Sequence, residues 1–246
     1  MSAASLFDVL DATWPAAAYH RCGPFTLREG QGGGSRVCAA TLDDPAYKAS
    51  AEDIAAAETR MREMGQQPLY MIREGDAQLD TQLASLGYGV SDPVDLLACE
   101  PALLADRTLP RVTVFTLWEP LAIMREIWAS AGIGPERQAV MARVTGPKTG
   151  LLGRHRDKPA GAGFVAVDQG MAMVHSVEIL PHRRRQGMGG WMIRGAAHWA
   201  LSQGADSLAV LVRRQNRAAR EFCASLGMSV VGQYHYRQPQ PRDEHQ

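Results

Sequence analysis

The feature that most constrains the fold of this chain is an internal repeat. The segments LYMIREGDAQLDTQLASLGYGV (69–90) and AVLVRRQNRAAREFCASLGMSV (209–230) align without a gap, 140 positions apart. The tetrapeptide ASLG at 84–87 recurs unchanged at 224–227. In both segments a short apolar stretch precedes an amphipathic helical pattern, a helix-stopping glycine and a second apolar stretch. We infer a duplication and therefore two related domains.

The stretch EPALLADRTLP (100–110) is bracketed by prolines and is the expected link between the two domains. We therefore expect one domain over residues 1–105 and a second over 106–246. The chain becomes polar and proline-bearing near its end, so we expect a disordered tail from about residue 237.

Composition excludes several classes of protein. The 26 basic and 26 acidic residues cancel, which argues against a nucleic-acid or membrane-surface partner. The four cysteines form no C-x-x-C pair, so we expect neither a metal site nor a disulfide scaffold. The first 15 residues carry an acidic residue where a signal peptide has basic ones, and no run of eighteen apolar residues occurs. We expect a cytoplasmic protein.

Residues 106–246 show the pattern of an α/β domain. EPLAIMREIWASAG (119–132) is typical of a helix that places Leu121, Met124, Ile127 and Trp128 on one face. Two apolar runs flank Asp168-Gln169-Gly170, which is typical of a hairpin. A helix from about residue 188 to a stop at Gly204, a strand at 207–212, a helix from Asn216 and a last strand near 229–236 follow.

The segment RRRQGMGG (183–190) stands between a predicted strand and a predicted helix. The first N–H groups of a helix have no intrahelical partner, and the helix dipole adds about half a positive charge there. Glycines let these N–H groups approach a ligand closely, so the segment predicts a site for a diphosphate. A Walker loop would need Gly-Lys-Ser/Thr, and a dinucleotide fingerprint would need a glycine where Met192 stands. Both of those alternatives fail.

The same segment resembles the R/Q-x-x-G-x-G/A loop of the GNAT superfamily of acyl-CoA-dependent N-acetyltransferases. Asn216, Ala219, Phe222 and Gly227 also match that family's downstream pattern. The resemblance, over about 111–236, implies a mixed sheet with flanking helices, splayed between its fourth and fifth strands. It implies acetyl-CoA as the co-substrate, and the cofactor-binding residues it implies are Ile179, Arg184, Arg185, Gln186, Gly187, Met188, Gly189, Gly190 and Asn216.

The N-terminal copy is similar to the later half of the same pattern, from SAEDIAAAETRMREMG (50–65) to LASLGYGVSDPVDLLAC (83–99). No phosphate loop precedes it, so the resemblance implies a tandem GNAT arrangement in which this copy is degenerate and has lost its cofactor site. We expect a monomer, because the first copy can take the place of a dimer partner.

Acyl transfer to an amine needs a base, because a lysine-like amine has a pKa of about 10.4 and is protonated near neutrality. Glu178, on the strand before the loop, is the candidate, in analogy to family members with a glutamate on strand four. The alternative is a solvated glutamate paired with a nearby arginine. Some relatives that acetylate protein N-termini carry the base where this chain has Leu211, which cannot ionise. This argues against a protein N-terminus as acceptor.

The tyrosine that often acts as general acid in the family is replaced here by Cys223. Its thiol is one candidate acid, and a small buried side chain is the alternative interpretation. Tyr234 and Tyr236 are substitutes, with packing as their alternative. His175 and Ser176 are weaker candidates for a water relay. The glycine-rich segment 30–36 lacks a following apolar helix and indicates a flexible turn or hairpin tip.

These observations predict an enzyme that transfers an acetyl group from acetyl-CoA to a primary amine, with a small-molecule amine as partner. Two alternatives stay open: an acyl-CoA-binding sensor without catalysis, and a protein-lysine acetyltransferase. The residues do not identify the amine or the acyl chain length.

Overall fold

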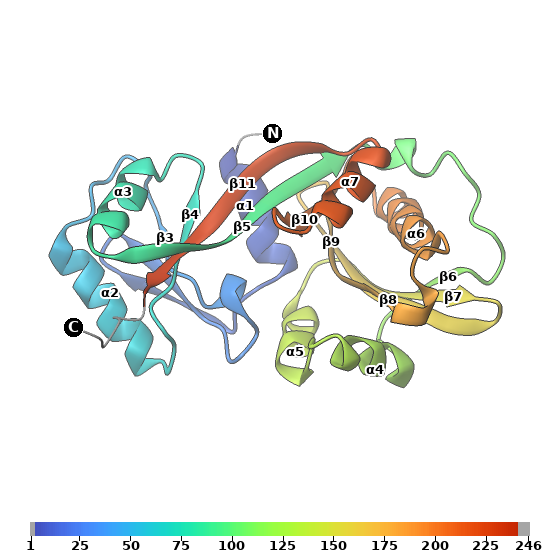
Figure 1. The fold of residues 1–246 in the computed structure, drawn as a ribbon, viewed down its shortest axis with the longest axis horizontal. Coiled ribbons are helices and arrows are strands. Elements are labelled where there is room, and N and C mark those ends of the chain that lie inside the picture. Colours follow the sequence, from blue (N-terminus) through green and yellow to red (C-terminus); the bar gives the residue numbers. More distant parts are fainter. Residues whose placement is uncertain (1–2, 241–246) are drawn as a thin grey trace. The chain divides into compact units, whose positions relative to one another are not determined.

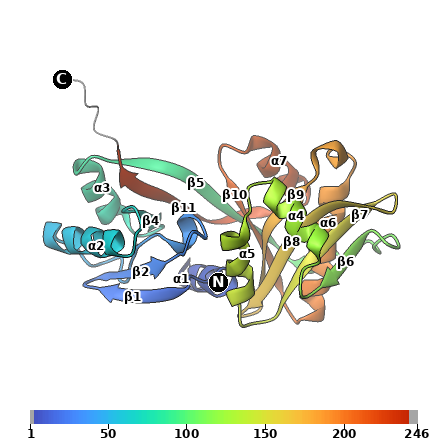
Figure 2. The same ribbon diagram turned by 90° about the horizontal axis from the view of Figure 1, so that it is seen from below.

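A computed structural model describes residues 3–240 of the chain (Figures 1 and 2). These residues form two compact units that are interleaved in the sequence. Unit 1 contains the residues up to 15, 96–212 and 216–231. Unit 2 contains residues 16–95, 213–215 and those from 232 onward. The expected boundary between residues 105 and 106 therefore does not coincide with a boundary between the compact units.

Unit 1 is built on a mixed sheet with the strand order β5-β10-β9-β8-β7-β6. Strands β6 to β9 are antiparallel neighbours, and β10 is parallel to β9. The strands of unit 1 are β6 (Val114–Leu117), β7 (Lys148–His155), β8 (Lys158–Asp168), β9 (Met171–Ile179) and β10 (Ser207–Arg213), with the ends of β5 (Tyr88–Cys99) and β11 (Ser229–Pro239). The mixed sheet predicted from the sequence is confirmed.

Helices cover both faces of this sheet, with α4 and α5 on one face and α6 and α7 on the other (Figures 1 and 2). Their bounds are α1 (Ala3–Thr13), α4 (Ala122–Ser130), α5 (Pro135–Arg143), α6 (Met188–Ser202) and α7 (Arg217–Ser225). Apolar side chains of α6, including Met192 and Ala196, pack on Val165, Val174 and Leu208 of the sheet. The helical spacing read from residue 188 onward thus corresponds to a buried helix face.

Helix α4 confirms the helix expected near residues 119–132, with one difference. Met124, Ile127 and Trp128 are buried, but Leu121 is 49% exposed. Leu121 is the N-cap and precedes the first helical turn, so its side chain does not share the buried face. The hairpin is also confirmed, since Gln169 and Gly170 both have positive φ between β8 and β9.

Unit 2 contains a small antiparallel sheet, β1-β2-β3, and the strand order β4-β11-β5. Its elements are β1 (Ala18–Cys22), β2 (Phe25–Glu29), β3 (Thr41–Leu42), α2 (Ala51–Glu63), β4 (Tyr70–Arg73) and α3 (Ala77–Ser85), with parts of β5 and β11. Phe25, Ile54, Met61, Tyr70 and Leu83 form the centre of its core. The core is therefore supplied by both helices and by strands of both sheets.

The repeat seen in the sequence is reproduced element by element. Helices α3 and α7 have bounds 140 positions apart, and each ends at a glycine with φ near +80°. A strand precedes and a strand follows each helix. The two N-caps differ, because Asn216 accepts a hydrogen bond from the Ala219 N–H while the Asp76 side chain makes no such bond. The two copies of the repeat thus share the helix but differ in the residue at its start.

One expectation at the C-terminal end is corrected. Residues 237–239, which the sequence places in a disordered tail, belong to strand β11, which continues to Pro239. Arg237 pairs with Tyr70 of β4, and its guanidinium donates to Asp80 and to the Tyr88 carbonyl. Residues 241–246 lie outside the described part. The segment from Gly30 connects β2 to the antiparallel strand β3, in agreement with a turn or hairpin connection, and it contains a 3-10 turn at Ser35–Val37. The Gly30 N–H donates to the Gln66 side chain. No helix among residues 3–240 is long and apolar enough to cross a membrane.

Candidate acyl-CoA site

The parallel strands β9 and β10 are paired only over their first residues. Their register joins Ser207–Val210 to Met171–Val174, and no pairing follows for the rest of β9. The sheet is therefore open between these two strands beyond Val174 and Val210. This is the splay expected between the fourth and fifth strands.

The part of β9 that does not pair with β10 contains a bulge in its pairing with β8. The register with β8 shifts between the pairs Phe164↔His175 and Ala162↔Glu178, and Ser176 has a φ of +52°. A positive φ is costly for a residue with a Cβ and persists only where the surroundings impose it. The indole N–H of Trp128 donates to the Ser176 carbonyl at 2.8 Å. Helix α4 thus fixes the bulge that places Glu178, a contact that no sequence signal indicated.

The loop after β9 leads into α6 through two residues with positive φ, Arg185 at +61° and Gly187 at +80°. Gly187 is the N-cap of α6, and a Cβ added to it would meet no atom within 4 Å. A glycine is needed at position 187 because of the left-handed backbone conformation, and not because a side chain would clash with a neighbour. Gly190, in the first turn, also faces open space, whereas Gly189 packs near the Phe222 ring.

These features fit a diphosphate. Met188, Gly189 and Gly190 are the first residues of α6, so their N–H groups have no acceptor within the helix. Arg184, Arg185 and Gln186 are exposed, and Met188 is buried in the core. The Arg184 Nε donates to the Ile179 carbonyl at 3.0 Å, and Gln186 Nε2 donates to the His182 carbonyl at 3.1 Å. The loop is thereby ordered with its glycine backbone open.

Glu178 is half-buried just before this loop. Burial raises the pKa of its carboxyl group, and the positive charges of Arg184 and Arg137 only partly offset this effect. Arg137 comes from α5 and was not singled out from the sequence. A carboxyl group with a raised pKa at the open edge of a sheet is a candidate for a general base.

The remaining candidates of unit 1 have structural partners. Cys223 is 4% exposed within the core, and burial followed by the nearby Cys99 raises its pKa to about 11. His175 is buried against Trp14 and Phe164, and its Nε2 lies 3.1 Å from the Thr13 Oγ1. This matches the interpretation of His175 as a hydrogen-bonded core residue. Asn216 is exposed and caps α7.

Tyr234 belongs to unit 2. Its ring packs edge-on against Tyr236 at a centroid distance of 5.5 Å, and both rings are buried. A side-chain hydrogen bond joins the two tyrosines. The packing interpretation of this pair therefore has direct support, and the catalytic interpretation of Tyr234 stays a prediction.

The geometry defines a class of protein: an α/β domain with a split sheet and a glycine-containing loop that opens a helix. Residues 121–228 match the family described as "Acetyltransferase (GNAT) family".

The chain is also 26% identical, over 110 residues, to the uncharacterized N-acetyltransferase YobR of Bacillus subtilis. The match covers 43% of this chain and 44% of that protein, so less than half of the relative's length is spanned.

Solved structures extend the likeness of fold to the whole chain. A GCN5-related N-acetyltransferase from Kribbella flavida superposes with a TM-score of 0.70 at 18% identity, covering 98% of this chain and 97% of that one. A protein of unknown function from Staphylococcus epidermidis gives 0.68 at 10% identity, covering 94% and 97%. A tandem GNAT protein from the clavulanic acid biosynthesis pathway gives 0.58 at 15% identity, covering 83% and 76%. The tandem GNAT fold is thus supported.

Proposed function

We propose that the protein is an N-acetyltransferase that transfers the acetyl group of acetyl-CoA to a primary amine of a small molecule. The observation that carries the proposal is the glycine-opened start of α6 next to the unpaired end of β9. An anion site and an extended strand edge adjoin there, as a ligand with a diphosphate and an amide-bearing arm requires.

In this proposal the N–H groups of Gly187 to Gly190 bind the diphosphate, and the side chains of Arg184, Arg185 and Gln186 surround it. The backbone near Ile179 offers hydrogen bonds to the pantetheine arm, and the exposed Asn216 completes the binding residues. Asn216 can do so while it caps α7, because its cap uses only Oδ1.

Glu178 is the proposed base. The bulge at Ser176 changes the direction of the strand between His175 and Glu178, and a half-buried carboxylate can accept a proton directly or through water. Bound acetyl-CoA would supply a thioester carbonyl for the amine to attack. The role of this chain is to bind the two reactants, remove a proton from the amine and keep the strand edge open.

The acid expected at Cys223 is not needed. A thiol of coenzyme A type has an ordinary pKa of about 8.5, so proton transfer from a buried thiol with a pKa of about 11 would be uphill. We propose that the leaving thiolate departs without proton donation from Cys223, and that this side chain packs the core instead.

We propose that unit 2 binds no second coenzyme. The start of its helix α2 is closed by its own side chains, because the Ser50 hydroxyl accepts from the Asp53 N–H while the Asp53 carboxylate accepts from the Ser50 N–H. This reciprocal capping box satisfies donors that an anion would otherwise use, and it adds negative charge. In this proposal the chain has one coenzyme site, in unit 1, and the first copy has a structural role.

The test is release of free thiol from acetyl-CoA in the presence of a panel of small primary amines. We expect turnover with at least one amine and its loss when acetyl-CoA is replaced by coenzyme A. Binding of coenzyme A without turnover for any amine would instead leave a sensor of acyl-CoA as the function.

A further inference from the structure

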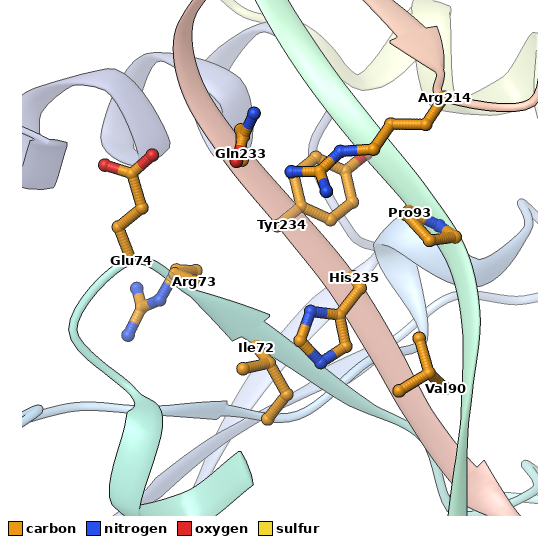
Figure 3. Close-up of a pocket in the computed structure, with 9 residues that line it drawn as sticks. All are labelled: Ile72, Arg73, Glu74, Val90, Pro93, Arg214, Gln233, Tyr234 and His235. Atoms are coloured by element: carbon orange, nitrogen blue, oxygen red, sulfur yellow. The ribbon is translucent and has the colours of Figure 1, made fainter.

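Unit 2 contains a pocket that the proposed function does not use (Figure 3). Its volume is about 260 Å³, and its lining comes from β4, β5 and β11 together with Glu74 and Arg214. Water occupies roughly 30 Å³ per molecule in the liquid, so the pocket holds on the order of nine non-hydrogen atoms. Such a volume fits a small metabolite and is too small for a coenzyme.

One wall of the pocket presents an arginine that a buried carboxylate holds in place. The Arg214 Nε donates to the Asp95 Oδ1 at 2.8 Å, and the same oxygen accepts from the Gln233 side chain at 3.2 Å. Asp95 is fully buried, and burial of a charged group is costly unless hydrogen bonds and an ion pair offset it. Within residues 3–240 the terminal guanidinium nitrogens of Arg214 have no bonding partner. Two donors in a fixed orientation therefore face the pocket.

Two further side chains of the lining, His235 and Arg73, also have carboxylate partners. His235 Nε2 lies 2.8 Å from the Asp80 Oδ1, and the Arg73 Nε lies 3.4 Å from the Asp76 Oδ2. Arg73, Arg214 and His235 of the lining thus each have a carboxylate partner. Carboxylates that orient ligand-binding side chains in this way are a common feature of ligand-binding sites.

Glu74 lies across from Arg214 in the lining (Figure 3). It is exposed, and its carboxylate makes no hydrogen bond or ion pair with any residue in 3–240. Ile72, Val90 and Pro93 add apolar side chains to the lining. The pocket therefore offers a donor pair on one side, a carboxylate on the other and apolar side chains in its lining.

We propose that this pocket binds a small zwitterion of the amino-acid class, with its carboxylate on Arg214 and its ammonium group on Glu74. The apolar residues contact its side chain. A pocket that served only to hold the strands together by ion pairs would leave Glu74 without a role.

The experiment is calorimetric titration of the full-length protein with the twenty standard L-amino acids. For each one that binds, the decarboxylated amine and the N-acetyl derivative are titrated next. We expect at least one amino acid to bind and both of its derivatives to bind at least tenfold more weakly. Glu74→Gln should remove the preference for the free amine over the N-acetyl form. Arg214→Gln should remove the preference for the acid over the decarboxylated amine.

The matched control is Arg213→Gln, because Arg213 is an exposed neighbour that pairs with Asp92 outside the pocket lining. It should leave binding unchanged, as should Gly190→Asp in the loop of unit 1. Glu74 is exposed and unbonded, so Glu74→Gln keeps the test decisive should Arg214→Gln fail to fold. Absence of binding by every amino acid, or binding that Glu74→Gln leaves unchanged, overturns the proposal.

Discussion

Glu178 combines a raised pKa with a position at the open strand edge, and these two properties make its protonation state consequential. Burial disfavours the ionised form, so ionisation of this group costs stability as the pH rises through its folded pKa. In the proposed function, the same ionised form accepts a proton from the amine. Under this proposal the residue trades stability for activity, as functional residues often do.

Glu178→Gln should lower kcat/KM by about 10²-fold, the lower end of the range for general-base catalysis. In the wild type, activity should fall as the pH drops through a pKa above 4.5, and the variant should lack this acid limb. The free energy of unfolding at pH 7 should not decrease, because the uncharged amide replaces a carboxylate that burial disfavours. A pH profile unchanged by the substitution would contradict the role as base.

Cys223→Ala should leave kcat/KM and its pH dependence within twofold of the wild type, since a buried thiol with a pKa of about 11 is a poor proton donor. The loss of core packing should lower the free energy of unfolding by about 1 kcal/mol, measured in urea. A tenfold loss of activity in a folded variant would restore the thiol as the acid.

At the level of elements, the two repeat helices differ at their N-caps. An ionisable residue precedes α3, and a neutral residue precedes α7. Asp76 is fully buried at the start of α3, where α7 has the neutral Asn216. Burial raises the pKa of Asp76, although the Arg73 N–H and charge partly oppose the shift. Its folded pKa lies above its unfolded value, so its contribution to stability falls as the pH rises through the folded pKa.

Asp76→Asn should therefore become progressively more stable relative to the wild type as the pH rises above 3.8, measured by urea unfolding at several pH values.

Asp80→Asn is the matched control in the same helix, with the opposite sign. Burial alone would raise the pKa of Asp80, but hydrogen bonds from Arg237 and His235 lower it overall. The wild type should thus lose this stabilisation only at acid pH, and the variant should be less stable near neutrality. Identical pH dependence in both variants would rule out the account of the repeat helices.

The elements that the sequence predicted well are those set by local patterns. The repeat, α4, the hairpin at Gly170 and the start of α6 follow from apolar spacing and glycine, which act within a few residues. The bulge at Ser176 was not predicted, because it depends on Trp128, which is 48 positions away in the sequence. Arg137 beside Glu178 and the partners of Asp95 are equally non-local. Local sequence patterns do not predict which side chains of different elements contact each other.

At the scale of the whole molecule, the compact units do not follow the order of the chain. Helix α1 belongs to unit 1 because Thr13 and Trp14 pack on His175 and Phe164, although the repeat places the N-terminal residues with the first copy. Strands β5 and β11 each contribute residues to both units. Propensity and periodicity are properties of segments, so neither could reveal this interleaving.

The chain should bind one coenzyme A molecule, because α6 begins at glycines and α2 begins at its own capping box. Calorimetry should give a stoichiometry near one per chain. A value near two would mean that the start of α2 also accepts an anion.

The most direct measurement is calorimetry of coenzyme A with the wild type, Gly190→Ala and Gly190→Asp. A Cβ at Gly190 meets no atom within 4 Å, and the helix dipole stabilises an acidic residue in the first turn. Both variants should therefore be as thermally stable as the wild type. Gly190→Ala should retain binding, and Gly190→Asp should weaken it at least 100-fold, because its carboxylate takes the place of the diphosphate. Undiminished binding by folded Gly190→Asp would contradict the assignment of this loop.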